Sequence, residues 1–552
     1  MKLKFYPFIL MLLCSISTLA QAPDWGWARS AGGRSFDQGT GITTDIAGNV
    51  YITGTFTSDT ITFGNITLRN SGDNDIFIVK YDPNGSVLWA QSAGGNLGDV
   101  SSSITTDAAG NAYLTGNFAS PTFAIGNINL TNANLGHYDI FIAKYDPNGN
   151  VLWAKSIGGN SDSFGEGITT DVLGNVYLTG ESWSSTLTFG NIILTNTELD
   201  AIFIVKYNTD GNVLWAKNAG GDNNDYGYGI ATDATGNIYL TGRFNGHSLT
   251  FENITLTNAH YADFDFFITK YNSAGNVLWA KSIGGSSSDR SSGIITDAAG
   301  NAYLTGSFNS PTITFGDIIL TNTNANGQYA DVFIAKYDPN GNVLWAQSAG
   351  GNFEDASSGI TTDAAGNVYN IGNFGPTITF GNTILTSTGD GDIFIVKYDP
   401  NGNVIWAKSA GGDYSDEGKS ITTDITGNVY LTGNFNSPTL AFGNTTLIRN
   451  GMDDIFVARL NTSSNAVPEY PNESEISTYP NPATDELTIT IPTYSAVNRT
   501  TLELFDIYGK LLKSVTVTGN TTTVDISGYP AGVYVVRFMD NKGVVAKRIV
   551  KR

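Results

Sequence analysis

Short runs of alternating apolar residues recur along almost the whole chain. One example is the run at 392–398, Asp-Ile-Phe-Ile-Val-Lys-Tyr, which has a period of two with both faces partly apolar. This period is typical of β-strands, and no segment after residue 20 carries a sustained apolar stripe with the 3.6-residue period of a helix. Gly-Asn pairs between the runs supply the positive φ values that tight hairpins need. The pattern predicts an all-β protein.

The runs belong to a unit of about 62 residues that occurs seven times. A tryptophan marks the same position in each unit: Trp27, Trp89, Trp153, Trp215, Trp279, Trp345 and Trp406. Each unit contains four expected strands, A to D, which in the sixth unit lie near residues 360–362, 368–371, 393–398 and 404–406. An extra ribbon at 378–385 separates strands B and C and explains the length of the unit.

The two ends of the repeat region are out of phase in a way that favours a closed ring. The region begins with a lone D strand at 25–30 and ends with a C strand at 454–459, which no D strand follows. Pairing these two strands completes seven four-stranded sheets and removes the exposed sheet edges of an open array. The sequence therefore predicts a seven-bladed β-propeller over residues 23–460, closed by its N-terminal strand.

The repeat also resembles a known family. The signature Thr-Asp-x-x-Gly-Asn-x-Tyr-x-Thr-Gly, as at residues 106–116, is similar to that of the bacterial β-propeller repeats called SBBP. The resemblance covers roughly residues 23–460. It implies a seven-bladed propeller in a surface or extracellular setting, and it implies no particular reaction or ligand.

The first twenty residues are typical of a signal peptide. Lys2 and Lys4 precede the apolar run 8–13, and the small residues that follow end at Ala20, where we expect cleavage. The apolar run is too short to span a bilayer, and no later stretch is long and apolar enough to do so. We therefore expect a chain that is exported and that is not transmembrane after processing.

The C-terminal part of the chain follows a different pattern. Residues 461–477 are rich in Asn, Ser, Pro and Glu and are expected to be a linker. Residues 478–552 contain short alternating strands that fit a small immunoglobulin-like β-sandwich. We expect these strands near residues 486–491, 501–505, 511–517, 521–526 and 532–538.

This segment closely resembles the type A C-terminal sorting domain of the type IX secretion system of Bacteroidota. The matching residues are Tyr479, Pro480, Asn481, Pro482, Asp506, Gly509, Pro530, Ala531, Gly532, Tyr534, Lys547 and Lys551. The resemblance implies transport across the outer membrane by the type IX secretion machinery. It also implies removal of the domain and either attachment to surface lipopolysaccharide or release. A carbohydrate-binding sandwich that stays attached is the alternative.

Charge and composition exclude several classes of function. The net charge of −21 disfavours binding to nucleic acid or to anionic lipid. With three histidines and one cysteine, at position 14, the chain cannot form an internal disulfide and has almost no means to build a Cys/His zinc site. We find no His-Glu-x-x-His, no phosphate-binding loop, no Gly-x-Ser-x-Gly and no cysteine pair, so an active site would consist of Asp and Glu alone.

Two sets of aspartates recur with the repeat. The first precedes the Gly-Asn turns and comprises Asp45, Asp107, Asp171, Asp233, Asp297, Asp363 and Asp424. The second follows a Gly-Gly pair and comprises Asp37, Asp99, Asp225, Asp289, Asp355 and Asp416, with Ser163 in the third unit. Because repetition gives all members similar surroundings, we interpret both sets as structural rather than catalytic. The Asp-Pro-Asn-Gly-Asn turns are likewise interpreted as hairpin turns, with calcium binding as the alternative and no other cofactor expected.

Residues that break the repeat are the better candidates for ligand binding. Aromatic and histidine side chains occur on the variable D–A and B–C connections, which we expect on one face: Trp183, Tyr226, Tyr228, His247, His260 and Tyr261. We therefore predict a non-enzymatic binding or adhesion protein at the cell surface, with a glycan or a protein as ligand. An Asp/Glu-dependent polysaccharide hydrolase or lyase and a purely structural surface-layer component remain the alternatives.

Overall fold

The computed structural model describes residues 22–196, 200–258, 260–324, 327–461, 477–490, 500–506, 510–517, 519–540 and 543–552. Within these ranges all regular elements are strands, which confirms the all-β class, and no helix is present that could cross a membrane. The predicted signal peptide at 1–20 and most of the predicted linker at 461–477 lie outside the described residues.

The repeat region contains the same four strands in every unit, in the order A, B, C and D. Strands A are β2 (Asp37–Thr44), β8 (Asp99–Thr106), β14 (Ser163–Thr170), β20 (Asp225–Thr232), β26 (Asp289–Thr296), β32 (Ala356–Thr362) and β38 (Asp416–Thr423). Strands B are β3 (Val50–Phe56), β9 (Ala112–Phe118), β15 (Val176–Ser182), β21 (Ile238–Phe244), β27 (Ala302–Phe308), β33 (Val368–Phe374) and β39 (Val429–Phe435).

The outer strands follow the same rule. Strands C are β6 (Asp75–Tyr81), β12 (Asp139–Tyr145), β18 (Ala201–Tyr207), β24 (Asp265–Tyr271), β30 (Asp331–Tyr337), β36 (Asp392–Tyr398) and β42 (Asp454–Leu460). Strands D are β7 (Val87–Gly94), β13 (Val151–Ile157), β19 (Val213–Gly221), β25 (Val277–Ile283), β31 (Val343–Ala349), β37 (Val404–Ala410) and β1 (Trp25–Ala31).

A two-stranded ribbon lies between strands B and C of each unit, as the sequence predicts. The ribbons are β4 (Thr60–Phe63) with β5 (Ile66–Arg69), β10 (Thr122–Ile125) with β11 (Ile128–Thr131), β16 (Thr186–Phe189) with β17 (Ile192–Thr195), β22 (Ser248–Phe251) with β23 (Ile254–Thr257), β28 (Thr312–Phe315) with β29 (Ile318–Thr321), β34 (Thr377–Phe380) with β35 (Thr383–Thr386), and β40 (Thr439–Phe442) with β41 (Thr445–Ile448). Two of them, β10–β11 and β22–β23, also extend the sheet of the preceding unit.

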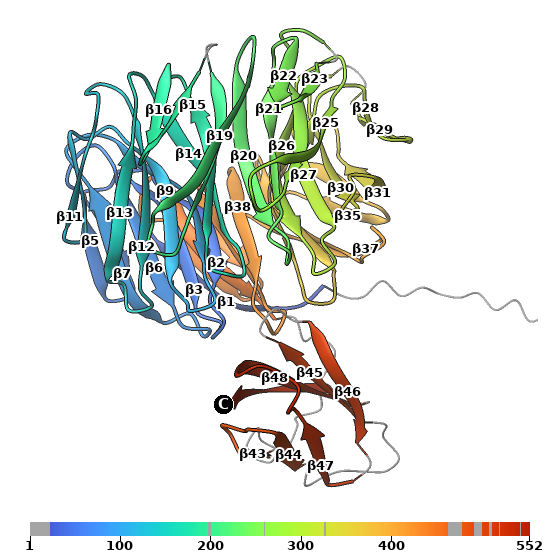
Figure 1. The fold of residues 1–552 in the computed structure, drawn as a ribbon. Coiled ribbons are helices and arrows are strands. Elements are labelled where there is room, and N and C mark those ends of the chain that lie inside the picture. The colour runs from blue at the N-terminus through green and yellow to red at the C-terminus, as the bar shows by residue number, and fades with distance from the viewer. Residues whose placement is uncertain are drawn as a thin grey trace, which may run out of the picture.

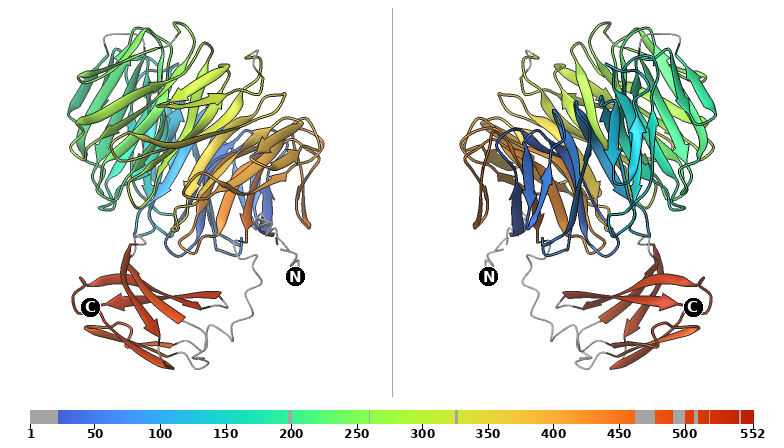
Figure 2. Two further views of the ribbon diagram at one scale, coloured as in Figure 1. Left: turned by 90° about the vertical axis from the view of Figure 1, so that its right-hand side faces the viewer. Right: turned by 90° about the vertical axis from the view of Figure 1, so that its left-hand side faces the viewer.

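The four strands of each unit form one antiparallel sheet, and we number these sheets 1 to 7 along the chain. Sheet 7 contains β38, β39 and β42 from the end of the region and β1 from its start, with Trp27 opposite Arg459. Sheets 1 and 7 lie side by side: they are the blue and orange sheets in both views of Figure 2, and β2 and β38 are labelled in Figure 1.

The hydrophobic core is divided into layers between neighbouring sheets. Tyr51 and Ile76 of sheet 1 pack with Leu114 of sheet 2 in one such layer. An equivalent layer lies between sheets 7 and 1, where Val457 packs with Ile52. Each sheet is therefore apolar on both faces, which explains why both faces of the strand pattern are partly apolar in the sequence.

A threonine at the end of each A strand links neighbouring sheets by a hydrogen bond. Its hydroxyl donates to the backbone carbonyl of the equivalent threonine in the preceding sheet, over 2.8–3.4 Å. Thr44 of sheet 1 donates in the same way to Thr423 of sheet 7, over 3.1 Å. Every pair of neighbouring sheets, including 7 and 1, shares this bond.

Each A strand contains a bulge near its beginning. In β14 the pairing with β15 shifts between Gly165 and Gly167, so Glu166 is the extra residue, and the other six A strands shift at the same place. A bulge removes one residue from the ladder and re-aims its side chain. This irregularity positions the candidate site described below.

The C-terminal segment forms two antiparallel sheets. One contains β43 (Ser477–Tyr479), β44 (Glu486–Thr490) and β47 (Thr521–Asp525), and the other contains β46 (Leu511–Val517), β45 (Thr500–Asp506), β48 (Gly532–Asp540) and β49 (Gly543–Lys551). Leu487, Leu504 and Ile549 belong to their shared core. Strands β43 and β49 are additions to the prediction, and Ser477 belongs to β43 rather than to the linker.

Candidate ligand-binding site lined by the A strands

The first set of aspartates stabilises the A–B turns. Oδ1 of Asp233 accepts the backbone N–H groups of Thr235 and Asn237, both over 3.0 Å, and Lys270 Nζ lies 3.6 Å from Oδ2. Burial opposes ionisation, but the hydrogen bonds from Thr235 and Asn237 outweigh it and lower the pKa of Asp233. The hydrogen bond from the turn asparagine recurs in all seven units. The geometry agrees with the structural interpretation of this set.

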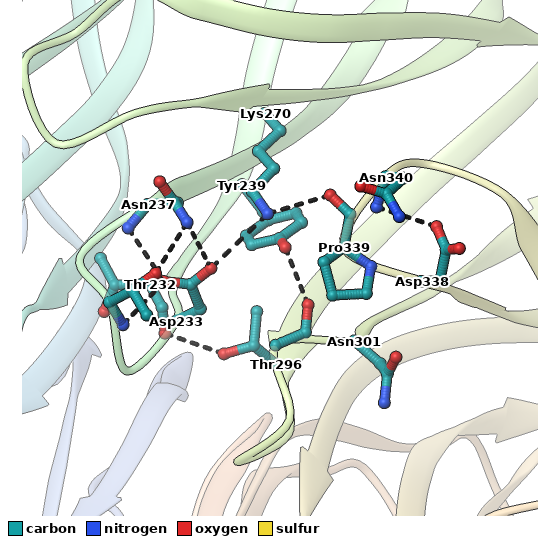
Figure 3. A network of polar contacts seen from close by, with 12 residues as sticks. Thr232, Asp233, Asn237, Tyr239, Lys270, Thr296, Asn301, Asp338, Pro339 and Asn340 are labelled. Atoms are coloured by element: carbon teal, nitrogen blue, oxygen red, sulfur yellow. Dashed lines mark hydrogen bonds and ion pairs between the residues drawn. The ribbon is translucent and has the colours of Figure 1, made fainter.

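In sheet 4 the repeated lysine, tyrosine and tryptophan connect the sheet to the next one. Figure 3 shows Lys270 Nζ donating to Pro339 O over 3.0 Å and Tyr239 reaching the next sheet, where its hydroxyl donates to Gly300 O over 2.8 Å. Trp279 Nε1 also donates to Pro339 O, over 3.2 Å. The tryptophan therefore packs between sheets, as the sequence indicates.

The second set of aspartates is buried beside the D–A connections. Oδ2 of Asp99 accepts the N–H of Gly95 over 2.7 Å and the hydroxyl of Ser120 over 2.9 Å, and burial raises the pKa of Asp99 to about 6. Units four and six have a glycine in place of this serine, and there burial raises the pKa values of Asp225 and Asp355 to about 8. The hydrogen bonds of these aspartates stabilise the D–A connections, but burial makes their carboxyl groups costly to ionise.

One side chain from each of the seven bulges lines a cavity of about 700 Å³, which we call the strand-A cavity. The seven residues are Thr40, Ser102, Glu166, Tyr228, Ser292, Ser358 and Lys419. Four are serine or threonine, so the chain keeps a small hydroxyl at this position as a rule. Glu166, Tyr228 and Lys419 break the rule, and the first two occur in neighbouring sheets.

Five residues of sheets 3 and 4 make up what we call the Glu166 site: Glu166, Glu181, Tyr226, Tyr228 and Arg243. Tyr226 and Tyr228 stack with their ring centroids 6.0 Å apart. The guanidinium of Arg243 lies 5.0 and 5.5 Å from these centroids, and both Arg243 and Tyr228 line the cavity. Cation–π contacts of this kind hold a guanidinium in place.

The two glutamates of the site have few hydrogen-bond donors and positive charges near them. Glu181 is 6% exposed, and its Oε2 has no hydrogen-bond partner among the described residues. Burial and the charges of Glu166 and Asp200 raise the pKa of Glu181, while the charge of Arg243 lowers it. Burial also raises the pKa of Glu166. One positive charge therefore faces several carboxylates.

The structure places the residues predicted from the sequence in two groups. Tyr228 lines the cavity, and the ring of Tyr226 stacks on the ring of Tyr228. The other four lie on connections outside the cavity lining: Trp183 meets Phe164 edge-on, His247 stacks on Tyr261 at 4.1 Å, and His260 lies 3.2 Å from Asp263. No contact joins these four residues into one site within the described part of the chain.

Glu166, Glu181 and Arg243 were missed in the sequence. Glu181 and Arg243 occupy equivalent positions on β15 and β21, where other units have Thr55, Asn117 or Ser307. An alignment of the seven units would have exposed these charged exceptions.

In the Asp-Pro-Asn-Gly-Asn turns, which were considered for calcium binding, the carboxylate oxygens accept hydrogen bonds from within the turn. Oδ1 of Asp146 accepts the N–H groups of Asn148 and Asn150 over 2.9 and 2.8 Å, and Oδ2 accepts the side chain of Asn150 over 2.8 Å. In the described ranges, no three His, Cys, Asp or Glu side chains are grouped so that they could hold a metal ion.

The residues of the predicted sorting motif tie the C-terminal strand to the rest of its domain. Asn481 Oδ1 accepts the N–H of Val550 over 2.9 Å, and Lys551 Nζ donates to Ser527 O over 3.1 Å. The Tyr534 hydroxyl donates to Pro530 O over 2.6 Å. Gly509 lies outside the described residues.

Comparison with protein families agrees with the two parts of the chain. Residues 477–552 match the family described as "Secretion system C-terminal sorting domain". Residues 27–58, 152–187, 214–247 and 405–438 match the family described as "Beta-propeller repeat".

Two similar curated proteins are much longer than this chain. A WD repeat-containing protein of Acanthamoeba polyphaga mimivirus is 26% identical over 509 residues, which cover 76% of this chain and 36% of the relative. The regulatory protein FlaEY of Caulobacter vibrioides is 22% identical over 226 residues, covering 40% of this chain and 23% of the relative. The chain thus spans about a third or less of the length of these curated relatives.

Among solved structures, the WD40 domain of Neurospora crassa Pan2 is similar with a TM-score of 0.31 and 10% identity, over 65% of this chain and 89% of that domain.

The sorting domain indicates type IX secretion to the cell surface or the exterior. The chain therefore contains β-propeller repeats, four of which match the family, and a type IX C-terminal sorting domain.

Proposed function

We propose that the seven sheets form a closed seven-bladed propeller that binds a glycan in the strand-A cavity at the cell surface. The pairing of β1 with β42, the apolar layer between sheets 7 and 1 and the Thr44–Thr423 hydrogen bond support closure. In a closed ring the A strands surround the axis, which accounts for a cavity lined by one bulge residue from every sheet.

The single observation that carries the binding function is the break in the ring of bulge residues. A purely structural ring has no need of Glu166 and Tyr228 where other sheets have serine or threonine. An aromatic ring beside charged groups in a concave site is a common arrangement for binding a polar ring such as a sugar. We place Trp183, His247, His260 and Tyr261 outside the strand-A cavity, where a longer glycan could reach them.

The experiment is a glycan array probed with the secreted protein and with two variants. We expect Tyr228→Ala to weaken binding by about tenfold or more, since aromatic stacking contributes about 1–3 kcal/mol. Tyr414→Ala changes an exposed aromatic residue on the connection before β38 and serves as the matched control. Equal loss in both variants, or no effect of Tyr228→Ala on a bound glycan, would contradict the proposal.

A polysaccharide hydrolase is the second candidate function. The raised pKa values of the neighbouring Glu166 and Glu181 favour it, because an acid that keeps its proton near neutral pH can serve as a general acid. Release of reducing ends from a bound glycan, lost in both Glu166→Gln and Glu181→Gln, would support this function. Binding without product release would support the binding protein.

After secretion, we propose that the sorting domain is removed and that the propeller is attached to surface lipopolysaccharide or released. This rests on the match of residues 477–552 to the sorting-domain family. Mass spectrometry of the surface protein tests it, because a processed chain ends before residue 477. A full-length chain at the surface would argue for a domain that stays attached.

A further inference from the structure

Within the described residues, the carboxylates of the Glu166 site lack the ion pairs that the buried aspartates of the A–B turns have. In six sheets the lysine of strand C lies 3.2–3.9 Å from the aspartate of the A–B turn, so those buried charges are paired. Glu181 has no such partner: its Oε2 is buried and makes no hydrogen bond to any residue that the structure describes. A buried carboxylate without a partner is strongly unfavourable in its ionised form.

Arg243 is the positive charge that acts on Glu181, but its guanidinium packs on aromatic rings. Its guanidinium lies 4.3 Å from the ring centroid of Phe264, in addition to its contacts with the two tyrosines. The Nε of Arg243 also has no hydrogen-bond partner in the described part of the chain. The arginine therefore weakens the repulsion among the carboxylates without forming an ion pair with Glu181.

The other charged groups around the site do not supply the missing cation. Asp200 of unit 3 adds negative charge near Glu181 and Tyr226. Across the cavity, Lys419 already pairs with Glu417, Glu354 accepts the N–H of Ala330 over 3.1 Å, and Arg290 is exposed on sheet 5. The local balance at sheets 3 and 4 stays negative.

We propose that the Glu166 site binds a protonated primary amine carried on a hydroxylated ring, which is the chemistry of an amino-sugar unit. The proposal rests on the glycan-binding function above and names the class of sugar. The ammonium group would supply the partner that Glu166 and Glu181 lack, and the Tyr228 ring beside them would take the face of the sugar. A metal ion is a poorer fit, because the described residues do not group three metal ligands.

This binding has a signature that neutral sugars do not share. Burial keeps a proton on the glutamate pair in the free protein. An ammonium ion that takes its place drives that proton off, so binding releases protons at a pH where the free amine is itself protonated. The released protons are counted by isothermal titration calorimetry in two buffers with different ionisation enthalpies.

The probes are the tetramers of glucosamine, N-acetylglucosamine and glucose, titrated into the full-length protein at about pH 6, where the glucosamine amine carries its proton. We expect the glucosamine tetramer to bind at least tenfold more tightly than the other two and to release protons. Glu166→Gln and Glu181→Gln keep the side-chain shape; both should abolish proton release and weaken binding tenfold or more. Asp75→Asn removes another buried carboxylate with a raised pKa, far from the site, and should change neither.

Two results would overturn the inference, and they differ in their meaning for the proposed function. Equal binding of the N-acetylated or glucose tetramer, without proton release and still sensitive to Tyr228→Ala, would refute the amine and leave the glycan-binding cavity intact. Failure of all three tetramers to bind, together with a glycan array that is unaffected by Tyr228→Ala, would refute both.

Discussion

The protein should become less stable as the pH rises from acidic to neutral, and two carboxylates allow the size of this effect to be worked out. Asp225 and Asp355 are fully buried, and burial raises their pKa values to about 8, against about 3.9 in an unfolded chain. Between about pH 5 and pH 7 the folded state keeps both protons while the unfolded state has lost them.

Because the folded state binds more protons in this window, its stability falls with pH. Each group contributes about 1.4 kcal/mol per pH unit, so the pair lowers the free energy of unfolding by about 2.7 kcal/mol per unit. The double variant Asp225→Asn/Asp355→Asn mimics the protonated state at every pH. It should match the parent protein near pH 5 and be more stable at pH 7.

Urea unfolding at about pH 5, 6 and 7 measures this slope. Asp146→Asn is the control. Hydrogen bonds outweigh the slight burial of Asp146 and lower its pKa, so the stability that its carboxylate contributes is lost only when the pH falls below about 4. Stability that is flat or rises over the window, or a double variant that keeps the parent slope, would refute the assignment of raised pKa values to these two buried carboxylates.

The remaining predictions concern closure, secretion and packing. Deleting residues 23–33 removes β1, and the loss of the buried Trp27 alone costs about 3–5 kcal/mol; we expect a lower melting temperature and aggregation by light scattering, and unchanged behaviour would argue against closure. A chain that ends after residue 468 lacks the sorting domain and should fold but accumulate in the periplasm, so normal surface display would contradict the sorting role. Trp153→Ala loses a half-buried ring and a 3.2 Å hydrogen bond to Thr209 O; it should cost about 2 kcal/mol in thermal unfolding and leave ligand binding unchanged.

The regular part of the fold could be predicted from the sequence because every unit repeats the same constraints. The period-two runs, the Gly-Asn turns and the inserted ribbon gave the strand order, and the repeated Asp233-type carboxylates have the turn-stabilising contacts expected of them. The strand β49 was missed because its basic residues 547–552 were interpreted only as a sorting motif. Its Ile549 is buried in the domain core, which a local pattern of charges does not reveal.

The candidate site could be predicted only in part, for a physical reason. Tyr226 and Tyr228 were identified, but the role of Glu166 depends on a bulge that turns its side chain out of the ladder. Strict alternation cannot locate a one-residue bulge, since the glycines on both sides fit either register. The coupling of Glu181 to Glu166 and Arg243 arises between strands and sheets, so it requires the fold.

The pairing of β1 with β42 has a consequence for quality control during export. The strand that β1 needs ends at Leu460, and the sorting domain begins only after it, at residue 477. A chain cut short within the repeats therefore loses both the partner of its first strand and its address. Only a chain that extends through the last repeat can present the secretion machinery with a sorting domain. The order of the segments alone should therefore keep truncated chains, whose β1 is unpaired and open to aggregation, off the cell surface.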